Sequence, residues 1–168
     1  MTSRRMIAAA LAFALSAAPA IAHEIKAGTL VITHPWVHAV PAGALATGGF
    51  MIIHNTGHEA DALVGAAITG VADAAFAEPV AGAADGACKA SKEIAIPAGA
   101  TVRLEPGKLG LVFGKVAKGL DENLYADGVL HFRKAGAIKV QFFIEAARAK
   151  ASKDVVLADC TKTLPLVQ

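Results

Sequence analysis

Histidines near the start of the chain have the types and spacing of a metal site. Residues 1–22 have the pattern of an export signal, with Arg4 and Arg5, an apolar stretch, and Ala20-Ile21-Ala22 before the predicted cleavage point. Cleavage there makes His23 the first residue of the mature protein. Its α-amine and ring Nδ1 can bind one metal ion together, and one further imidazole gives three nitrogen ligands, a histidine brace. Cu(II) favours nitrogen ligands in tetragonal geometry, so this pattern predicts a copper site. The alternative is that His23 is simply the residue that follows the signal.

The second ligand follows from the hairpin that the next residues are expected to form. We expect Lys26-Ala27-Gly28-Thr29 to be a tight turn in which Lys26 pairs with Thr29, so that His23 lies opposite Ile32. On this register His34 shares a strand face with Ile32. His34 is then the diagonal neighbour of His23, about 7 to 8 Å away between backbones, which two imidazoles can bridge through one metal.

Two more residues are candidate ligands of the same site. His38 continues the alternation of His34 and comes within reach if the strand bends after Pro35. Met51 offers a weak axial sulfur, although a single methionine in a strand more often packs in the core. The remaining histidines are expected to face solvent: His54, His58 and His131. For His131 the alternative is an inward position near the brace.

The chain contains two cysteines, Cys88 and Cys160. In an oxidising compartment such a pair usually forms a disulfide, which would stabilise the fold by about 3 to 5 kcal/mol and tie the C-terminal segment to the middle of the chain. The competing interpretation is a thiolate copper site, which the wide spacing and the lack of a neighbouring histidine disfavour.

Composition limits the class of protein. Without residues 1–22 the chain suits a single domain, and its 16 Lys and Arg fall to 14 against 14 Asp and Glu, because two arginines leave with the signal. A neutral balance gives no basic patch for nucleic acid, and no apolar segment is long enough for stable membrane insertion. The mature chain has two serines, Ser91 and Ser152, neither in a nucleophile motif, so we expect a protein that is not an enzyme.

Short segments rich in β-branched and aromatic residues recur between Pro and Gly turns, a pattern typical of an all-β sandwich. Five glycine and proline breaks within Ala60 to Ala87 exclude a long helix there, despite its many alanines. Trp36 is expected to fill the core between the sheets. The predicted strands are Thr29 to Thr33, Trp36 to Val40, Gly49 to His54, Glu93 to Ile96, Thr101 to Leu104, Leu109 to Phe113, Gly128 to Phe132 and Ala137 to Ala146.

An ordered set of short motifs resembles the periplasmic copper chaperones of the PCuAC family. The motifs run from His23 to Ala146, and they include His34-Pro35-Trp36, Gly48 to Gly57, Leu104-Glu105-Pro106-Gly107 and Leu130-His131-Phe132. The resemblance implies a cupredoxin-like Greek-key β-sandwich in a single domain. Residues 23–146 would form that domain, and residues 147–168 would be an extension held by the disulfide.

The usual copper ligands of the PCuAC family are missing from this chain. That family's site has two histidines and two methionines, and the matching positions here hold residues without imidazole or thioether groups: Glu78, Ala90, Gly110 and Val112. A Cu(I) site of the usual type is therefore not expected. Some members of the family, from methane-oxidising bacteria, are described as holding copper by a histidine brace, which agrees with the ligands predicted at His23 and His34.

The sequence thus predicts a soluble periplasmic copper-binding protein. It would hold Cu(II) through the brace and deliver it to a copper enzyme, for which the resemblance suggests cytochrome c oxidase or a copper oxygenase, or to another copper chaperone. One alternative is an interaction module of the same fold that has lost copper binding. Another is a brace-type copper oxidase or monooxygenase, although one Trp and Tyr125 offer little aromatic surface for a polysaccharide.

Overall fold

The computed structural model describes residues 24–71, 73–80 and 88–146, and all regular structure in these ranges is β. No helix in the described part of the chain has the length and hydropathy of a membrane span. The strands are β1 (Glu24–Ala27), β2 (Leu30–His38), β3 (Ala44–Asn55), β4 (Asp61–Ile68), β5 (Ala74–Pro79), β6 (Cys88–Ser91), β7 (Ile94–Ile96), β8 (Thr101–Leu104), β9 (Gly110–Val116), β10 (Tyr125–Phe132) and β11 (Gly136–Glu145).

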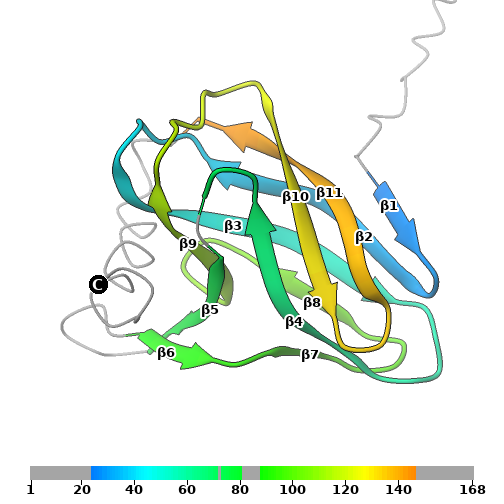
Figure 1. The fold of residues 1–168 in the computed structure, drawn as a ribbon. Helices are drawn as coiled ribbons and strands as arrows, with labels where there is room; N and C mark the ends of the chain where they lie inside the picture. The colour runs from blue at the N-terminus through cyan, green and yellow to red at the C-terminus, as the bar shows by residue number, and fades with distance from the viewer. Residues whose placement is uncertain (1–23, 72, 81–87, 147–168) are drawn as a thin grey trace, which may run out of the picture.

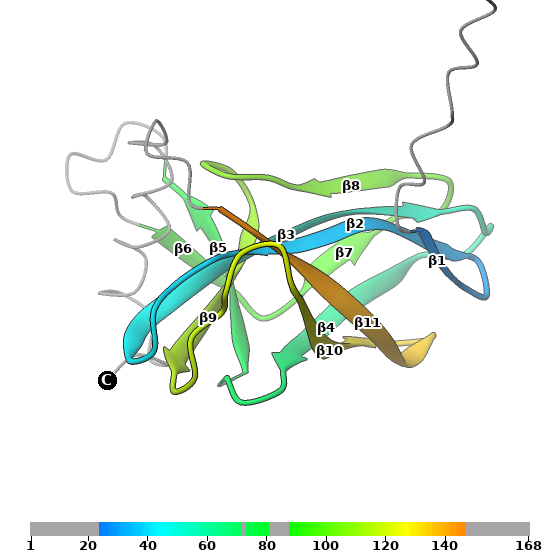
Figure 2. The ribbon, with the colours of Figure 1, turned by 90° about the horizontal axis from the view of Figure 1, so that it is seen from above.

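The strands form one hydrogen-bonded sheet that folds over on itself. Its order is β6-β5-β9-β3-β2-β11-β10-β4-β7, with β1 added to β2 and β8 added to β3. Figure 1 shows β4, β10 and β11 in front of β2, β3 and β8, and Figure 2 shows the same two layers from above. The expected all-β, cupredoxin-like sandwich in a single domain is confirmed.

The two layers meet in one continuous hydrophobic core. Phe113 of β9 and Phe142 of β11 pack edge to face across it, with 5.7 Å between ring centroids, and both are fully buried. Buried residues alternate with more exposed ones along β11, which is the pattern expected for two sheets packed face to face. Other fully buried members are Leu30, Ile32, Met51, Ile53, Leu63, Ile96, Leu104, Leu111 and Leu130.

Most of the predicted strands are present. Thr101 to Leu104 is reproduced without change, and the alanine-rich segment contains β4 and β5 rather than a long helix. One prediction is wrong in detail, because the two strands expected at Thr29 to Thr33 and Trp36 to Val40 are a single strand, β2. A bulge, described below, allows that strand to continue past Pro35.

Trp36 does not fill the core between the layers, contrary to the sequence-based expectation. Its half-buried ring lies on the outer face of the sheet, in a small separate cluster with Phe50, Ala77 and Val112. The Trp36 and Phe50 rings are 4.6 Å apart between centroids. The cause is the local geometry of β2, which turns Trp36 outward.

Candidate metal site

A β-bulge in β2 sets the direction of the first candidate ligand. Thr33 pairs with Ile52 of β3 and Trp36 pairs with Phe50, so His34 and Pro35 together stand opposite the single residue Met51. His34 adopts a positive φ of 50°, a conformation that only a few per cent of residues other than glycine adopt. Proline contributes no N–H to the ladder, which suits it to an irregular position of this kind.

The bulge places His34 on the face opposite to Ile32, whereas the sequence predicted that the two side chains share one face. Ile32 points into the core and is fully buried, whereas the His34 side chain is half exposed on the outer face. Strict alternation would have kept the two side chains on one face. Because two residues of β2 oppose one residue of β3, the alternation changes phase at the bulge, and His34, Trp36 and His38 line up on the outside.

The predicted register of the first hairpin is also wrong. Ala27 pairs with Leu30, and the two-residue loop is Gly28-Thr29 rather than Ala27-Gly28. Gly28 has a φ of 59°, the positive value that a two-residue hairpin loop needs at its first position. The shift places Glu24 opposite Thr33, the residue before His34. His23 itself lies outside the described residues.

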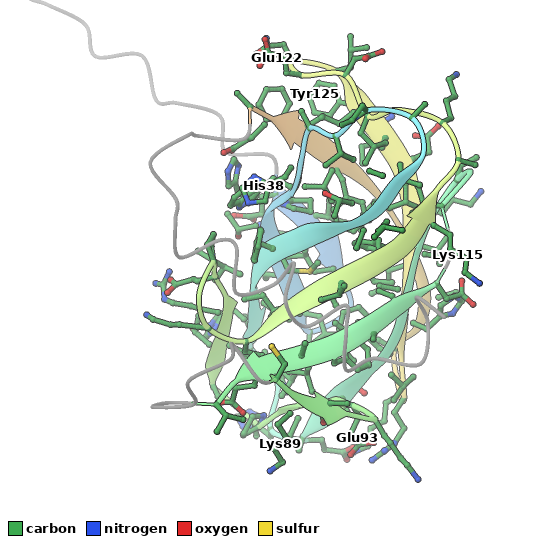
Figure 3. The ribbon with its side chains drawn as sticks, turned by 90° about the vertical axis from the view of Figure 1, so that its left-hand side faces the viewer. His38, Lys89, Glu93, Lys115, Glu122 and Tyr125 are labelled. Carbon is green, nitrogen blue, oxygen red and sulfur yellow. The ribbon has the colours of Figure 1, made fainter. Side chains whose placement is uncertain are left out.

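His34 lies at the edge of a compact group of rings that contains Trp36, His38 and Phe50. Its ring centroid is 6.4 Å from that of Trp36, and the His38 ring stands edge-on to Trp36 at 5.0 Å. His38 also packs edge-on against Phe50 at 5.5 Å, and both of its ring nitrogens are buried. Figure 3 shows His38 at the side of the molecule below Tyr125 and Glu122, away from Lys89 and Glu93 at the opposite end.

Glu145 is a member of this group that the sequence did not indicate. It is the last residue of β11 and pairs with His38 in the parallel β2–β11 ladder. One carboxylate oxygen, Oε1, lies 2.9 Å from Nε2 of His34. Glu145 is 111 residues from His34 along the chain, so no local pattern could have linked them.

Met51 lies close to His34 along the sheet but faces the other way. It stands opposite the bulge, yet its side chain is fully buried in the main core. Phe50, its neighbour on β3, points to the outer face and contacts Trp36. The structure therefore brings His34 and His38 to one face and places Met51 on the opposite face.

The other histidines differ in their surroundings. His58 and His131 are exposed, as expected. His54 is half-buried rather than fully solvated, because its Nδ1 lies 2.9 Å from the Thr101 hydroxyl and 3.3 Å from the Ala100 carbonyl oxygen.

Of the two cysteines, Cys88 begins β6 and packs beside the outer cluster of Trp36 and Phe50. Cys160 lies outside the described residues, so the Cys88–Cys160 disulfide stays a prediction.

The four positions that correspond to the usual PCuAC ligands come together in the sheet. Ala77, the residue before Glu78, pairs with Ala90 on β6 and with Gly110 on β9, and Val112 lies two residues further along β9. The side chains there offer no imidazole or thioether. Phe50 also fills the space, since a Cβ added at Gly110 would meet its ring carbon Cε1 at 3.1 Å.

Within the described residues no group of three or more His, Cys, Asp or Glu side chains is arranged to hold a metal ion. His34 and Glu145 form a pair of potential ligand side chains, one fewer than the three that define such a group. The first described residue, Glu24, pairs with Thr33, the residue before His34.

The fold defines a cupredoxin-like β-sandwich domain of the PCuAC type. The model of the LpqE-like lipoprotein family matches residues 30–144, and this chain belongs to that family. No relative was found among curated protein sequences.

Solved PCuAC domains have the same fold. The copper-bound PCuAC domain from PmoF2 is 24% identical, with a TM-score of 0.64 over 74% of this chain and 98% of that one. The apo PCuAC domain from PmoF1 is 25% identical, with a TM-score of 0.65 over 74% and 99%. The Cu(I)-bound protein DR1885 from Deinococcus radiodurans is 19% identical, with a TM-score of 0.52 over 75% and 83%.

Proposed function

We propose that the mature protein is a periplasmic copper-binding protein that holds one Cu(II) through a histidine brace. His23 supplies its α-amine and ring Nδ1, and His34 supplies a third nitrogen. The bound copper is cargo, passed to a copper-accepting enzyme such as a cytochrome c oxidase or copper oxygenase, or to another copper chaperone. The PCuAC fold supports this proposal, as does the copper bound to the similar PmoF2 domain.

The observation that carries the proposal is the way two strands share one edge of β2. On that edge β1 pairs with Leu30 to Thr33, and β11 pairs with Trp36 to His38. Only His34 and Pro35 lie between the two segments. Since Glu24 pairs with Thr33 and one residue spans at most about 3.6 Å, a chain that begins at His23 begins beside this gap.

The donor set at the gap favours Cu(II). Imidazole and amine nitrogens suit it, whereas Cu(I) selects soft sulfur ligands. Cys88 is the sulfur-bearing residue that the described structure places beside the outer cluster of Trp36 and Phe50, and we propose that a disulfide with Cys160 keeps it from binding the metal. Met51 is the nearest methionine along the sheet, and its side chain is buried on the other side. We therefore leave Met51 out of the proposed ligand set, and we place His38 as a packing neighbour of Trp36.

A copper titration of the mature protein, with a competing chelator and electron paramagnetic resonance, tests the proposal. We expect one equivalent of Cu(II) with resolved nitrogen couplings. His34→Ala should lower the affinity by orders of magnitude, and so should one alanine added before His23, which moves the α-amine away but keeps the ring. His131→Ala, an exposed histidine on β10, is the matched control and should bind like the wild type.

Each result has a distinct meaning. Failure of the wild type to take up one equivalent supports an interaction module that has lost copper binding. If the His34→Ala protein and the extended protein both bind copper with wild-type affinity, the histidine-brace proposal is rejected. Copper-dependent oxidation of a polysaccharide would instead support the monooxygenase interpretation.

A further inference from the structure

Glu145 fixes the position of the His34 ring from the far end of the chain. The Glu145 backbone is anchored, because its carbonyl oxygen accepts a hydrogen bond of 2.8 Å from the Ala39 N–H, beyond its pairing with His38. From this anchored backbone the carboxylate reaches back to Nε2 of His34 at 2.9 Å. The carboxylate is more covered than the imidazole, with 26% of the Glu145 side chain exposed against 50% for His34.

A carboxylate placed at Nε2 selects one form of a neutral imidazole. An ionised carboxylate only accepts hydrogen bonds, so the Nε2 atom facing it must carry the proton. The lone pair of the ring is then on Nδ1, on the side away from Glu145. A metal-binding histidine commonly gives its second ring N–H to a carboxylate, which sets the ring orientation and raises its basicity.

We propose that Glu145 is a positioning residue for copper, holding His34 as the Nε2–H tautomer so that Nδ1 is the atom that binds the metal. This inference rests on the proposed function and adds a residue and a coordinating atom to it. Glu145 does not bind the metal; it keeps the ring turned outward at the bulge. The bulge and the β2–β11 pairing are both needed, since the first exposes His34 and the second brings the carboxylate to it.

The first arm of the test uses the copper-free protein. Nitrogen-15 NMR at about pH 8, where an ordinary histidine is neutral, reports the tautomer of each ring. We expect His34 to be protonated on Nε2 in the wild type and to become a mixture of tautomers in Glu145→Ala. Glu145→Gln retains an acceptor oxygen without the charge and should give an intermediate result. An unchanged His34 signal in Glu145→Ala would overturn the proposal.

The second arm measures Cu(II) affinity. Loss of a carboxylate of this kind typically costs 10- to 100-fold, so we expect Glu145→Ala to bind about 10- to 100-fold more weakly and Glu145→Gln to fall between. Glu122→Ala is the matched control, since it removes an exposed carboxylate next to Asn123, whose N–H donates a hydrogen bond of 2.9 Å to the carbonyl oxygen of Ile144, the residue before Glu145. A loss of the same size in Glu122→Ala would mean that net charge alone is responsible, and tighter binding in Glu145→Ala would mean that the carboxylate competes with the metal for Nε2.

The two arms separate this inference from the proposed function. If copper binding does not depend on His34 in the wild type, the brace proposal fails whatever the NMR shows. If copper binding depends on His34 but the tautomer and the affinity are unchanged in Glu145→Ala, the brace stands and the role of Glu145 is rejected.

Discussion

Trp36 is the only tryptophan of the chain, and its position beside His34 makes it a reporter of the site. The two ring centroids are 6.4 Å apart. A Cu(II) ion bound to the His34 ring would lie close enough to the Trp36 ring to quench its indole fluorescence efficiently. The bulge thus places the single tryptophan next to the proposed ligand, although the sequence suggested a core position for it.

We predict that one equivalent of Cu(II) quenches most of the Trp36 fluorescence of the mature protein. A fluorescence titration of the wild type and of His34→Ala checks this, and the variant should need far more copper for the same effect. Zn(II), which has a filled d shell, is the control ion and should quench little. Quenching that is identical in both proteins would place the bound copper somewhere other than His34.

At the level of secondary structure, Asp61 joins β4 to the turn between β10 and β11. Its Oδ1 accepts hydrogen bonds from the N–H groups of Ala62 and Lys134, and its Oδ2 accepts one from Ala135. Partial burial by itself raises the pKa of Asp61, but these three hydrogen bonds and the charge of Lys134 outweigh it and hold the pKa below its usual value. The carboxylate therefore stabilises the folded state in its ionised form.

We predict that Asp61→Ala lowers the free energy of unfolding by about 1 to 2 kcal/mol at pH 7, because the charged acceptor of three backbone donors is lost. Since the folded pKa is depressed, this contribution is complete above the unfolded value of about 3.9 and falls as the pH drops through the folded value. Urea unfolding of both proteins at pH 7 and near pH 2 should show the difference shrinking with acid. A difference that grows on acidification would contradict this account.

Gly128 lets β10 approach its neighbours more closely than any other residue would allow. A Cβ added there would lie 2.6 Å from the carbonyl oxygen of Ala67 on β4 and 2.7 Å from the Phe142 ring on β11. The first of these atoms belongs to the backbone, which cannot move without disturbing the β4–β10 ladder.

We predict that Gly128→Ala destabilises the fold by about 1 to 3 kcal/mol or more, the usual cost of forcing extra volume into a packed core. Gly65→Ala on the adjacent β4 is the matched control, because its added Cβ would meet only His131, at an ordinary 3.5 Å. Thermal unfolding of the two variants makes the comparison. Equal melting temperatures would show that the sheet can open at Gly128 at no cost.

Across the molecule as a whole, Cys88 lies in β6, at one end of the sheet order. β6 pairs only with β5 among the described strands, so a covalent link there would restrain a strand that the sheet holds on one side. Cys160 is the only other cysteine in the sequence.

We predict that thiol titration of the unfolded, unreduced protein finds no free cysteine, and that reduction lowers the free energy of unfolding by about 3 to 5 kcal/mol. Copper affinity should not change on reduction, because the proposed ligands are nitrogens. Two titratable thiols in the exported protein, or loss of copper binding in a folded Cys88→Ser variant, would instead favour a thiolate copper site.

Local sequence patterns were enough to establish the class of this protein. Alternating apolar residues and Pro or Gly turns predicted the all-β sandwich, because each strand must bury one face and each turn must reverse the chain within a few residues. Breaks such as Gly65, Gly70 and Pro79 correctly excluded a long helix from the alanine-rich segment. The ordered motifs predicted the PCuAC fold, and the residues at 78, 90, 110 and 112 showed that the usual ligand types are missing.

The arrangement of the candidate site, in contrast, depends on contacts between distant strands. A bulge is a relation between two strands, so the sequence of β2 alone could not show that His34 and Pro35 share the single partner Met51. From that one change in phase follow the outward direction of His34 and the position of Trp36 outside the core. Glu145 reaches His34 only because β11 returns in parallel beside β2, a pairing between the two ends of the domain that local sequence patterns do not encode.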